Sequence, residues 1–107
     1  KQHIAKMVNI LHMNKIVDSM ITDALDAYKN QQPIDIKSFI DRDDDVDALR
    51  NTIFRESLTY MMENSKKIEM CMYYSMISRY LERCADHACK IAEKVNYMVT
   101  GKRAEIK

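Results

Sequence analysis

The sequence predicts an all-α fold, an up-down-up bundle of three helices like that of spectrin. Three observations predict it. Apolar residues recur at spacings of three and four along most of the chain, as one face of a helix requires. The 107 residues include one glycine and one proline, too few for the many turns of a β-protein. Two short polar breaks divide the periodic pattern, so three helices of similar length should pack side by side.

The first helix is expected over about residues 2–30, because its apolar positions form one continuous face. A polar segment at residues 30–33 ends it. The apolar face consists of Ile4, Met7, Val8, Leu11, Val17, Ile21, Leu25 and Tyr28.

The second helix is expected over about residues 34–63. Pro33 would occupy its first turn, where the missing N–H is not needed. The third helix is expected over about residues 66–99, with Ser65 as its N-cap and Gly101 in the left-handed position beyond its end. Residues 1–107 are thus predicted to form one domain.

Charge and cysteine content narrow the classes of function. The formal net charge of +1 disfavours a nucleic-acid partner. The three cysteines, an odd number within helical periodicity, indicate a reducing, cytoplasmic protein rather than a secreted disulfide framework. No apolar run is long enough for a membrane span. Because the chain opens at Lys1, we expect a piece of something longer, which a parent chain or a partner would place at the membrane periphery.

Two pairs of acidic residues are candidates for a binding site. Asp43 and Asp47 fall inside the apolar sector of the second helix, whereas Asp44 and Asp45 point elsewhere. Glu82 and Asp86 form a second pair with the same spacing at the border of the apolar face of the third helix. If these helices fold back about residues 64–65, the midpoints of the two pairs are equally far from the turn. The four carboxylates are therefore expected at one level.

Converging carboxylates repel one another unless cations neutralise them, so divalent or trivalent metal ions are the natural ligands. Asp18 is expected near the same level, and His87 adjoins the second pair, so both are additional candidate ligands. The alternative is an ion-pair network without metal, in which the carboxylates pair with nearby arginines, namely Arg42, Arg50, Arg79 and Arg83.

The other reactive residues indicate no chemistry of their own. Cys71 and Cys89 fall on the core side of the third helix and are interpreted as small apolar side chains. No Ser-His-Asp arrangement, glycine-rich phosphate loop or dinucleotide fingerprint occurs, so we do not expect an enzyme.

Two regions of the chain resemble the PhoU family of phosphate-uptake regulators. The first comprises residues 42–49, RDDDVDAL, with residues 58–64, LTYMMEN; the second comprises residues 79–93, RYLERCADHACKIAE, with residues 97–101, YMVTG. The resemblance implies a PhoU-like bundle with a metal motif on each of two helices, at Asp43 with Asp47 and at Glu82 with Asp86. It also implies multinuclear iron or zinc clusters, and contacts with a phosphate transporter and its sensor kinase.

Two departures from the family pattern carry further expectations. Family members usually hold two three-helix repeats, whereas this chain has one, so a homodimer is expected to restore the full surface. Cys84 and Cys89 stand where the family motif is usually not a thiol, which leaves a redox or soft-metal variation open.

The alternative function is a helical adaptor or oligomerisation module without bound metal, for example a cytoplasmic domain of a transporter. A second apolar stripe on the third helix favours it, because such a stripe implies either a wide core contact or a dimer interface. The stripe consists of Tyr73, Tyr80, Ile91 and Met98.

Overall fold

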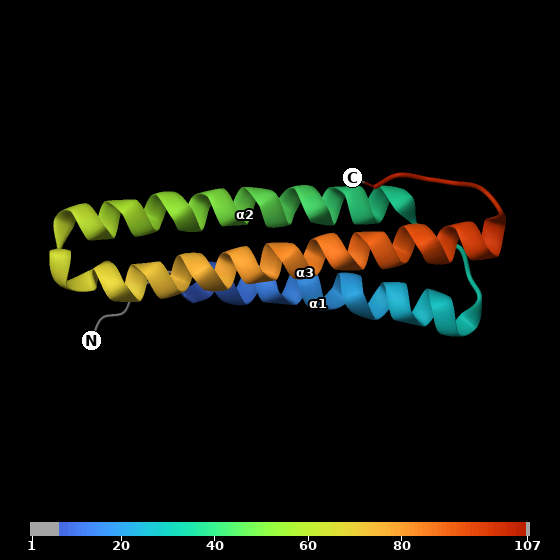
Figure 1. Ribbon diagram of the computed structural model, residues 1–107, viewed down its shortest axis with the longest axis horizontal. Helices are drawn as coiled ribbons and strands as arrows, with labels where there is room; N and C mark the ends of the chain where they lie inside the picture. The colour runs from blue at the N-terminus through green and yellow to red at the C-terminus, as the bar shows by residue number, and fades with distance from the viewer. Residues whose placement is uncertain (1–6, 107) are drawn as a thin grey trace.

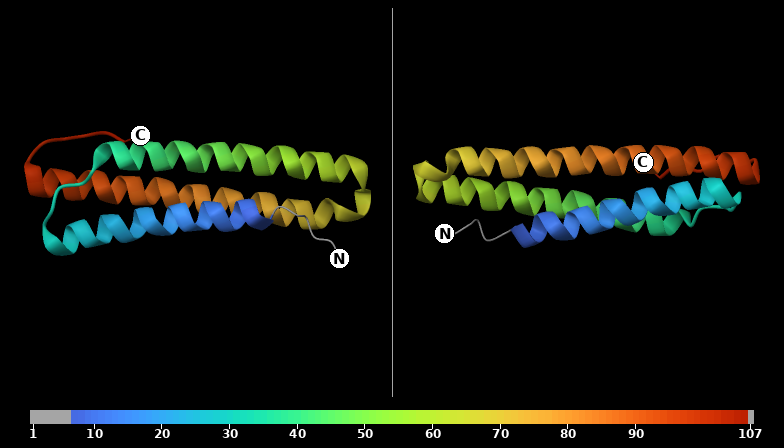
Figure 2. Two further views of the ribbon diagram at one scale, coloured as in Figure 1. Left: turned by 180° about the vertical axis from the view of Figure 1, so that it is seen from behind. Right: turned by 90° about the horizontal axis from the view of Figure 1, so that it is seen from below.

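The computed structural model describes residues 7–106 and confirms the all-α three-helix bundle. Helix α1 spans Met7–Asn30, α2 spans Ile36–Glu63 and α3 spans Ile68–Thr100, and a 3-10 turn, η1, covers Ser65–Lys67. The helices lie side by side in a rod of 53 × 21 × 16 Å, shown in Figure 1 and from two further sides in Figure 2. Residues 2–6, where the first helix was expected to begin, lie outside the described part. Within the described part, no helix combines the length and apolar character needed to cross a bilayer.

The start of α2 differs from the expectation. The helix begins at Ile36, and Pro33 lies in the linker rather than in the first turn. The reason is the side chain of Asp35, which caps the helix by accepting a hydrogen bond from the Ser38 N–H at 3.2 Å.

The turn between α2 and α3 also differs. Ser65 is not the N-cap of α3. Asn64 caps η1, where its side-chain oxygen accepts a hydrogen bond from the Lys66 N–H at 2.9 Å, and the N-cap position of α3 is Lys67, which makes no side-chain capping hydrogen bond. The residues of η1 then precede α3, which begins at Ile68. At the other end of α3, Gly101 has a φ of 75°, so it takes the left-handed conformation expected of it.

Buried side chains from all three helices form one hydrophobic core. Helix α3 contributes small residues, including Ala85, Ala88 and Ala92, so the other helices can approach its backbone closely. Helix α1 contributes the completely buried Met13 and Met20, whose flexible side chains fill the remaining space.

The segment after α3 folds back along the bundle. Residues 102–106, here termed the C-terminal strap, run from Gly101 toward the first half of α2 (Figure 1). Ile106 is buried in the core, and its N–H donates a hydrogen bond of 2.8 Å to Oε2 of Glu93 on α3. The strap is therefore anchored at its far end by one apolar side chain and one hydrogen bond.

Two contacts define the register of α2 against α3. Arg50 Nη1 lies 3.4 Å from Glu82 Oε1, and Cys89 Sγ lies 3.9 Å from Asp43 Oδ1. Both pairs are centred on residue 66. The expected centre at residues 64–65 was wrong, because η1 lengthens the turn.

Candidate metal site

Asp43 lies inside the interface between α2 and α3. Its side chain is buried, with 5% of the residue exposed, on the same face as the core residues Phe39 and Val46. This position confirms the expectation that Asp43 lies within the apolar sector of the second helix. Burial of an ionised carboxylate costs several kcal/mol unless other groups or a cation compensate its charge.

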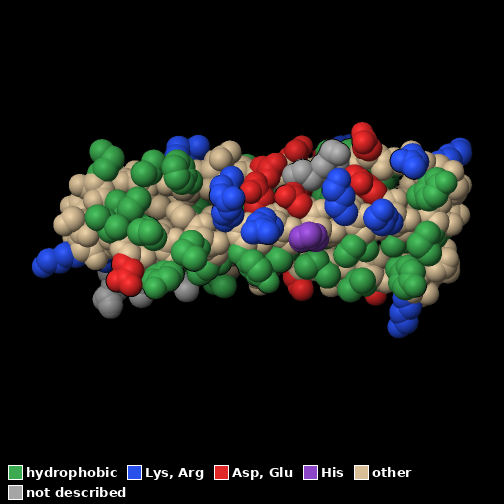
Figure 3. Space-filling model, in the orientation of Figure 1, with side chains coloured by type: hydrophobic (Ala, Val, Ile, Leu, Met, Phe, Trp, Pro, Cys, Tyr) green, Lys and Arg blue, Asp and Glu red, His purple; other side chains and the backbone are tan. Residues whose placement is uncertain are grey.

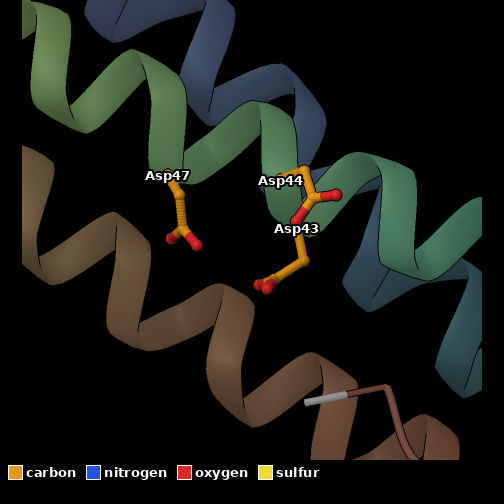
Figure 4. Close-up of side chains that lie close together, drawn as sticks. All are labelled: Asp43, Asp44 and Asp47. Atoms are coloured by element: carbon orange, nitrogen blue, oxygen red, sulfur yellow. The ribbon is translucent and has the colours of Figure 1, made fainter.

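Asp44 and Asp47 bring two further carboxylates to Asp43. One carboxylate oxygen from each of the three residues lies within 4.8 Å of the others. Figure 4 shows Asp43 and Asp47 pointing from α2 toward α3, while Asp44 projects beside them. Asp43, Asp44 and Asp47 are here termed the aspartate group. Because Asp44 is exposed and Asp43 is buried, this group reaches from solvent into the helix interface. Its oxygen donors fit a hard or borderline cation.

The second acidic pair is staggered relative to the first. With the helices centred on residue 66, Asp47 is level with residue 85, next to Asp86, while Glu82 is level with Arg50. The two pairs are thus displaced by about 4.5 Å along the axis, at 1.5 Å per residue, rather than lying at one level. Asp86 is the member of this pair that lies nearer the aspartate group.

Glu82 takes part in an ion pair with Arg50, whose guanidinium nitrogen is 3.4 Å from the carboxylate. For this residue the structure follows the ion-pair alternative. Arg42, another expected partner, instead donates from α2 to α1: its Nη1 lies 2.9 Å from both Ser19 Oγ and Asp23 Oδ2. It also stacks on Phe39, 4.7 Å from the ring centroid. Arg42 therefore joins α1 to α2 rather than neutralising the aspartate group.

The two additional candidate ligands, Asp18 and His87, lie on the surface. Asp18 and His87 are both exposed, and the aspartate group does not include either of them among the described residues. Asp18 does lie near the level of Asp47, since the contacts of Asn9 with Glu56 and of Arg42 with Asp23 share one centre. Its side chain points away because the inward positions of α1 at that level belong to apolar residues.

Charged side chains of both signs gather on one face of the molecule. Figure 3 shows Asp and Glu side chains gathered over the middle of one face, with Lys and Arg side chains on both sides of them. The acidic side chains of this face therefore have basic side chains close to them, and the whole chain is nearly neutral.

Sequence reasoning missed two participants. Asp44 was expected to point elsewhere, but its short side chain folds back toward Asp43. Cys89 is buried as expected of a small core residue, yet its thiol donates toward Asp43 Oδ1 at 3.9 Å. The sequence does indicate Asp44, because it belongs to the unbroken run of aspartates at residues 43–45. The approach of Cys89 to Asp43 could be predicted only from the correct register of α2 against α3.

Comparison with known proteins places these features in a family. The family model of the PhoU domain matches residues 10–95. The chain is 42% identical over 91 residues to the "phosphate-specific transport system accessory protein PhoU homolog" of Zymomonas mobilis, covering 85% of this chain and 38% of that protein. The protein of the same name from Rhizobium meliloti is 37% identical over 90 residues, covering 84% of this chain and 38% of its own length.

A third relative of that name, from Clostridium acetobutylicum, is 34% identical over 106 residues, which cover 99% of this chain and 48% of the relative. The chain thus spans less than half the length of these three relatives. No solved structure matches the chain. The family match covers all of α2, most of α1 and α3, and both acidic pairs, and the chain belongs to the PhoU family.

Proposed function

We propose that the chain is a non-enzymatic, PhoU-type accessory domain that regulates phosphate uptake by binding metal and docking onto partner proteins. The observation that carries this proposal is the aspartate group, which lies within the part of the chain that the family model matches. The names of the relatives, accessory proteins of phosphate-specific transport systems, support the phosphate role.

Metal binding would compensate the charge of the aspartate group. Asp43 and Asp47 supply carboxylates from one helix face, Asp44 adds an exposed one, and Asp86 lies close in register. Glu82 would join only by exchanging its ion pair with Arg50 for the metal. Carboxylate oxygens suit divalent or trivalent ions, with multinuclear iron or zinc the species that the family resemblance implies.

Metal content tests this proposal directly. Protein purified without chelator should hold metal, and Asp43→Asn/Asp47→Asn should hold roughly tenfold less, because two charged donors are lost while side-chain volume is kept. The matched control is Asp41→Asn/Asp45→Asn, which changes the same charge at two exposed positions of α2. Elemental analysis gives the result. Equal metal content in the two double variants would contradict metal binding by the aspartate group.

The proposed partners are a phosphate transporter and its sensor kinase, which would hold this cytoplasmic domain at the membrane periphery. The full protein containing this domain, expressed in bacteria that lack their own PhoU-type regulator, should restore repression of a phosphate-starvation reporter. Asp43→Asn/Asp47→Asn should fail to restore it, and Asp41→Asn/Asp45→Asn should succeed. Failure of the unchanged protein to repress would contradict the phosphate role.

A second candidate function is self-association or adaptor activity through α3. The predicted apolar stripe is exposed on the surface of the bundle: Tyr73, Tyr80 and Met98 each expose more than half of their area. An exposed apolar stripe of this kind suits a homodimer interface, and the oligomeric state of the protein in solution tests this function.

A further inference from the structure

We propose that Cys89 is a thiolate ligand of the metal site, so that the site takes borderline and soft divalent ions such as zinc in preference to hard ones such as magnesium. This inference deepens the proposed function and rests on it. Its starting point is one contact: Cys89 Sγ on α3 lies 3.9 Å from Asp43 Oδ1 on α2.

The two atoms meet in the buried part of the interface. Cys89 has no exposed area and Asp43 exposes 5% of its own. Few solvent molecules could then compete for the inner side of an ion held there. The exposed Asp44 lies at the other side of the aspartate group and provides the route from solvent.

The separation suits two ligands of one ion. A tetrahedral zinc ion with a Zn–S bond of about 2.3 Å and a Zn–O bond of about 2.0 Å holds the two donors about 3.5 Å apart. The observed 3.9 Å between Cys89 and Asp43 differs from this by a small side-chain adjustment. The carboxylate oxygens of the aspartate group lie within 4.8 Å of one another, whereas two oxygens bound to one tetrahedral zinc ion are about 3.3 Å apart, so these side chains would close further around an ion.

The thiol changes the chemistry of the donor set. Carboxylates alone prefer hard ions, whereas a thiolate selects softer ones. Formation of the metal–sulfur bond breaks the S–H bond of Cys89 and releases one proton to solvent, with no change in oxidation state. Affinity for zinc should therefore rise with pH more steeply than affinity for magnesium.

The position of Cys89 distinguishes it from the other thiols. Cys71 lies near the η1 end of α3, far along the rod from the aspartate group, and Cys84 is five residues before Cys89 on a different face. Glu93, one turn after Cys89, binds the N–H of Ile106 and so ties the C-terminal strap beside the inner end of the site. Because Cys84 is a thiol of the same helix on a different face, Cys84→Ser is the matched control for Cys89→Ser.

Cobalt(II), a spectroscopic substitute for zinc, tests the proposal. Titration of the unchanged chain with Co²⁺ should produce the near-ultraviolet absorption of a thiolate–cobalt bond. Cys89→Ser should lose this band and bind zinc roughly tenfold more weakly, with a smaller loss of affinity for the harder ion Mn²⁺. Cys84→Ser should keep the band. Circular dichroism and thermal unfolding check that Cys89→Ser is folded, and Cys89→Ala serves in its place if it is not.

The possible failures are distinguishable. If cobalt binds without the thiolate band, or Cys89→Ser keeps it, Cys89 is not a ligand, while the proposed metal-binding function stands. If calorimetry detects no binding of cobalt, zinc or manganese to the unchanged chain, both the proposed function and this inference are wrong.

Discussion

Cys71 and Tyr74 lie near the turn between α2 and α3, where both side chains are shielded from solvent. Burial raises the pKa of the Cys71 thiol above its ordinary value of 9.0, and nearby Lys67 offsets part of this effect. Burial also raises the pKa of Tyr74, as do the neighbouring Cys71 and Tyr60. Both groups are therefore held in their neutral forms by the folded state.

A raised folded-state pKa makes stability depend on alkaline pH. Below the pKa of the unfolded chain, both states keep the proton and the full stability is present; as the pH rises above about 9, the unfolded state gives up its proton first. The free energy of unfolding, measured with urea at pH 7.5 and pH 10, should fall at the higher pH. Cys71→Ala should reduce this fall.

Cys84→Ala is the control for that measurement, because Cys84 is a half-buried thiol of the same helix. In Cys84→Ala, the fall in the free energy of unfolding between pH 7.5 and pH 10 should stay closer to that of the unchanged chain. If Cys71→Ala and Cys84→Ala behave alike, the buried thiol of Cys71 is not the source of the alkaline loss.

The ends of the helices were predicted less accurately than the helices themselves. The periodic apolar faces were sufficient for the bundle, but they could not place the first residue of α2, which depends on the Asp35 side chain accepting from Ser38. Nor could they show that Asn64 caps the separate 3-10 turn η1, rather than Ser65 capping α3. That difference mattered for the site, because the extra residues of η1 shifted α3 and staggered the acidic pairs.

The C-terminal strap is an element that the apolar pattern did not indicate. Its anchor, Ile106, follows a polar segment, and only the folded chain shows it in the core. Ile106→Ala should lower the free energy of unfolding by roughly 2 kcal/mol, the low end for truncating a buried isoleucine, because the chain end can relax. Urea denaturation measures the change.

Ile77→Ala provides the comparison, since Ile77 is an exposed isoleucine of α3. Its effect should stay within about 0.5 kcal/mol. Equal effects of Ile106→Ala and Ile77→Ala would mean that the strap is not held against the bundle in solution.

At the scale of the whole molecule, the apolar pattern did not place every surface correctly. Because α1 turns a different side to the core, four residues expected on the apolar face of the first helix are each more than half exposed, namely Val8, Leu11, Leu25 and Tyr28. The helical wheel placed Asp43 inside and Asp45 outside, because both follow from one 3.6-residue period. The partners of each carboxylate depend on contacts between helices. The pairing of Glu82 with Arg50 and the approach of Cys89 to Asp43 required the register that η1 imposes.

The exposed apolar stripe makes a prediction about the assembly of the molecule. Tyr80, 67% exposed, lies at its centre, with Tyr73 and Ile91 on either side along α3. Aromatic side chains at the centre of an exposed stripe are typical of an interface, and the full length of the rod is available to bury it. Size-exclusion chromatography with light scattering should give twice the mass of one chain at high concentration.

Tyr80→Glu should shift this equilibrium to the single chain, because dimer formation would bury an unpaired carboxylate. Tyr28→Glu is the matched control: Tyr28 is 51% exposed on α1, outside the stripe, and its substitution should leave the dimer intact. A single-chain mass at every concentration would contradict homodimerisation, and loss of the dimer in both variants would place the interface elsewhere. Metal analysis of the two variants separates assembly from the aspartate group, since Tyr80 lies on a different face of the bundle and its substitution should leave the metal content unchanged.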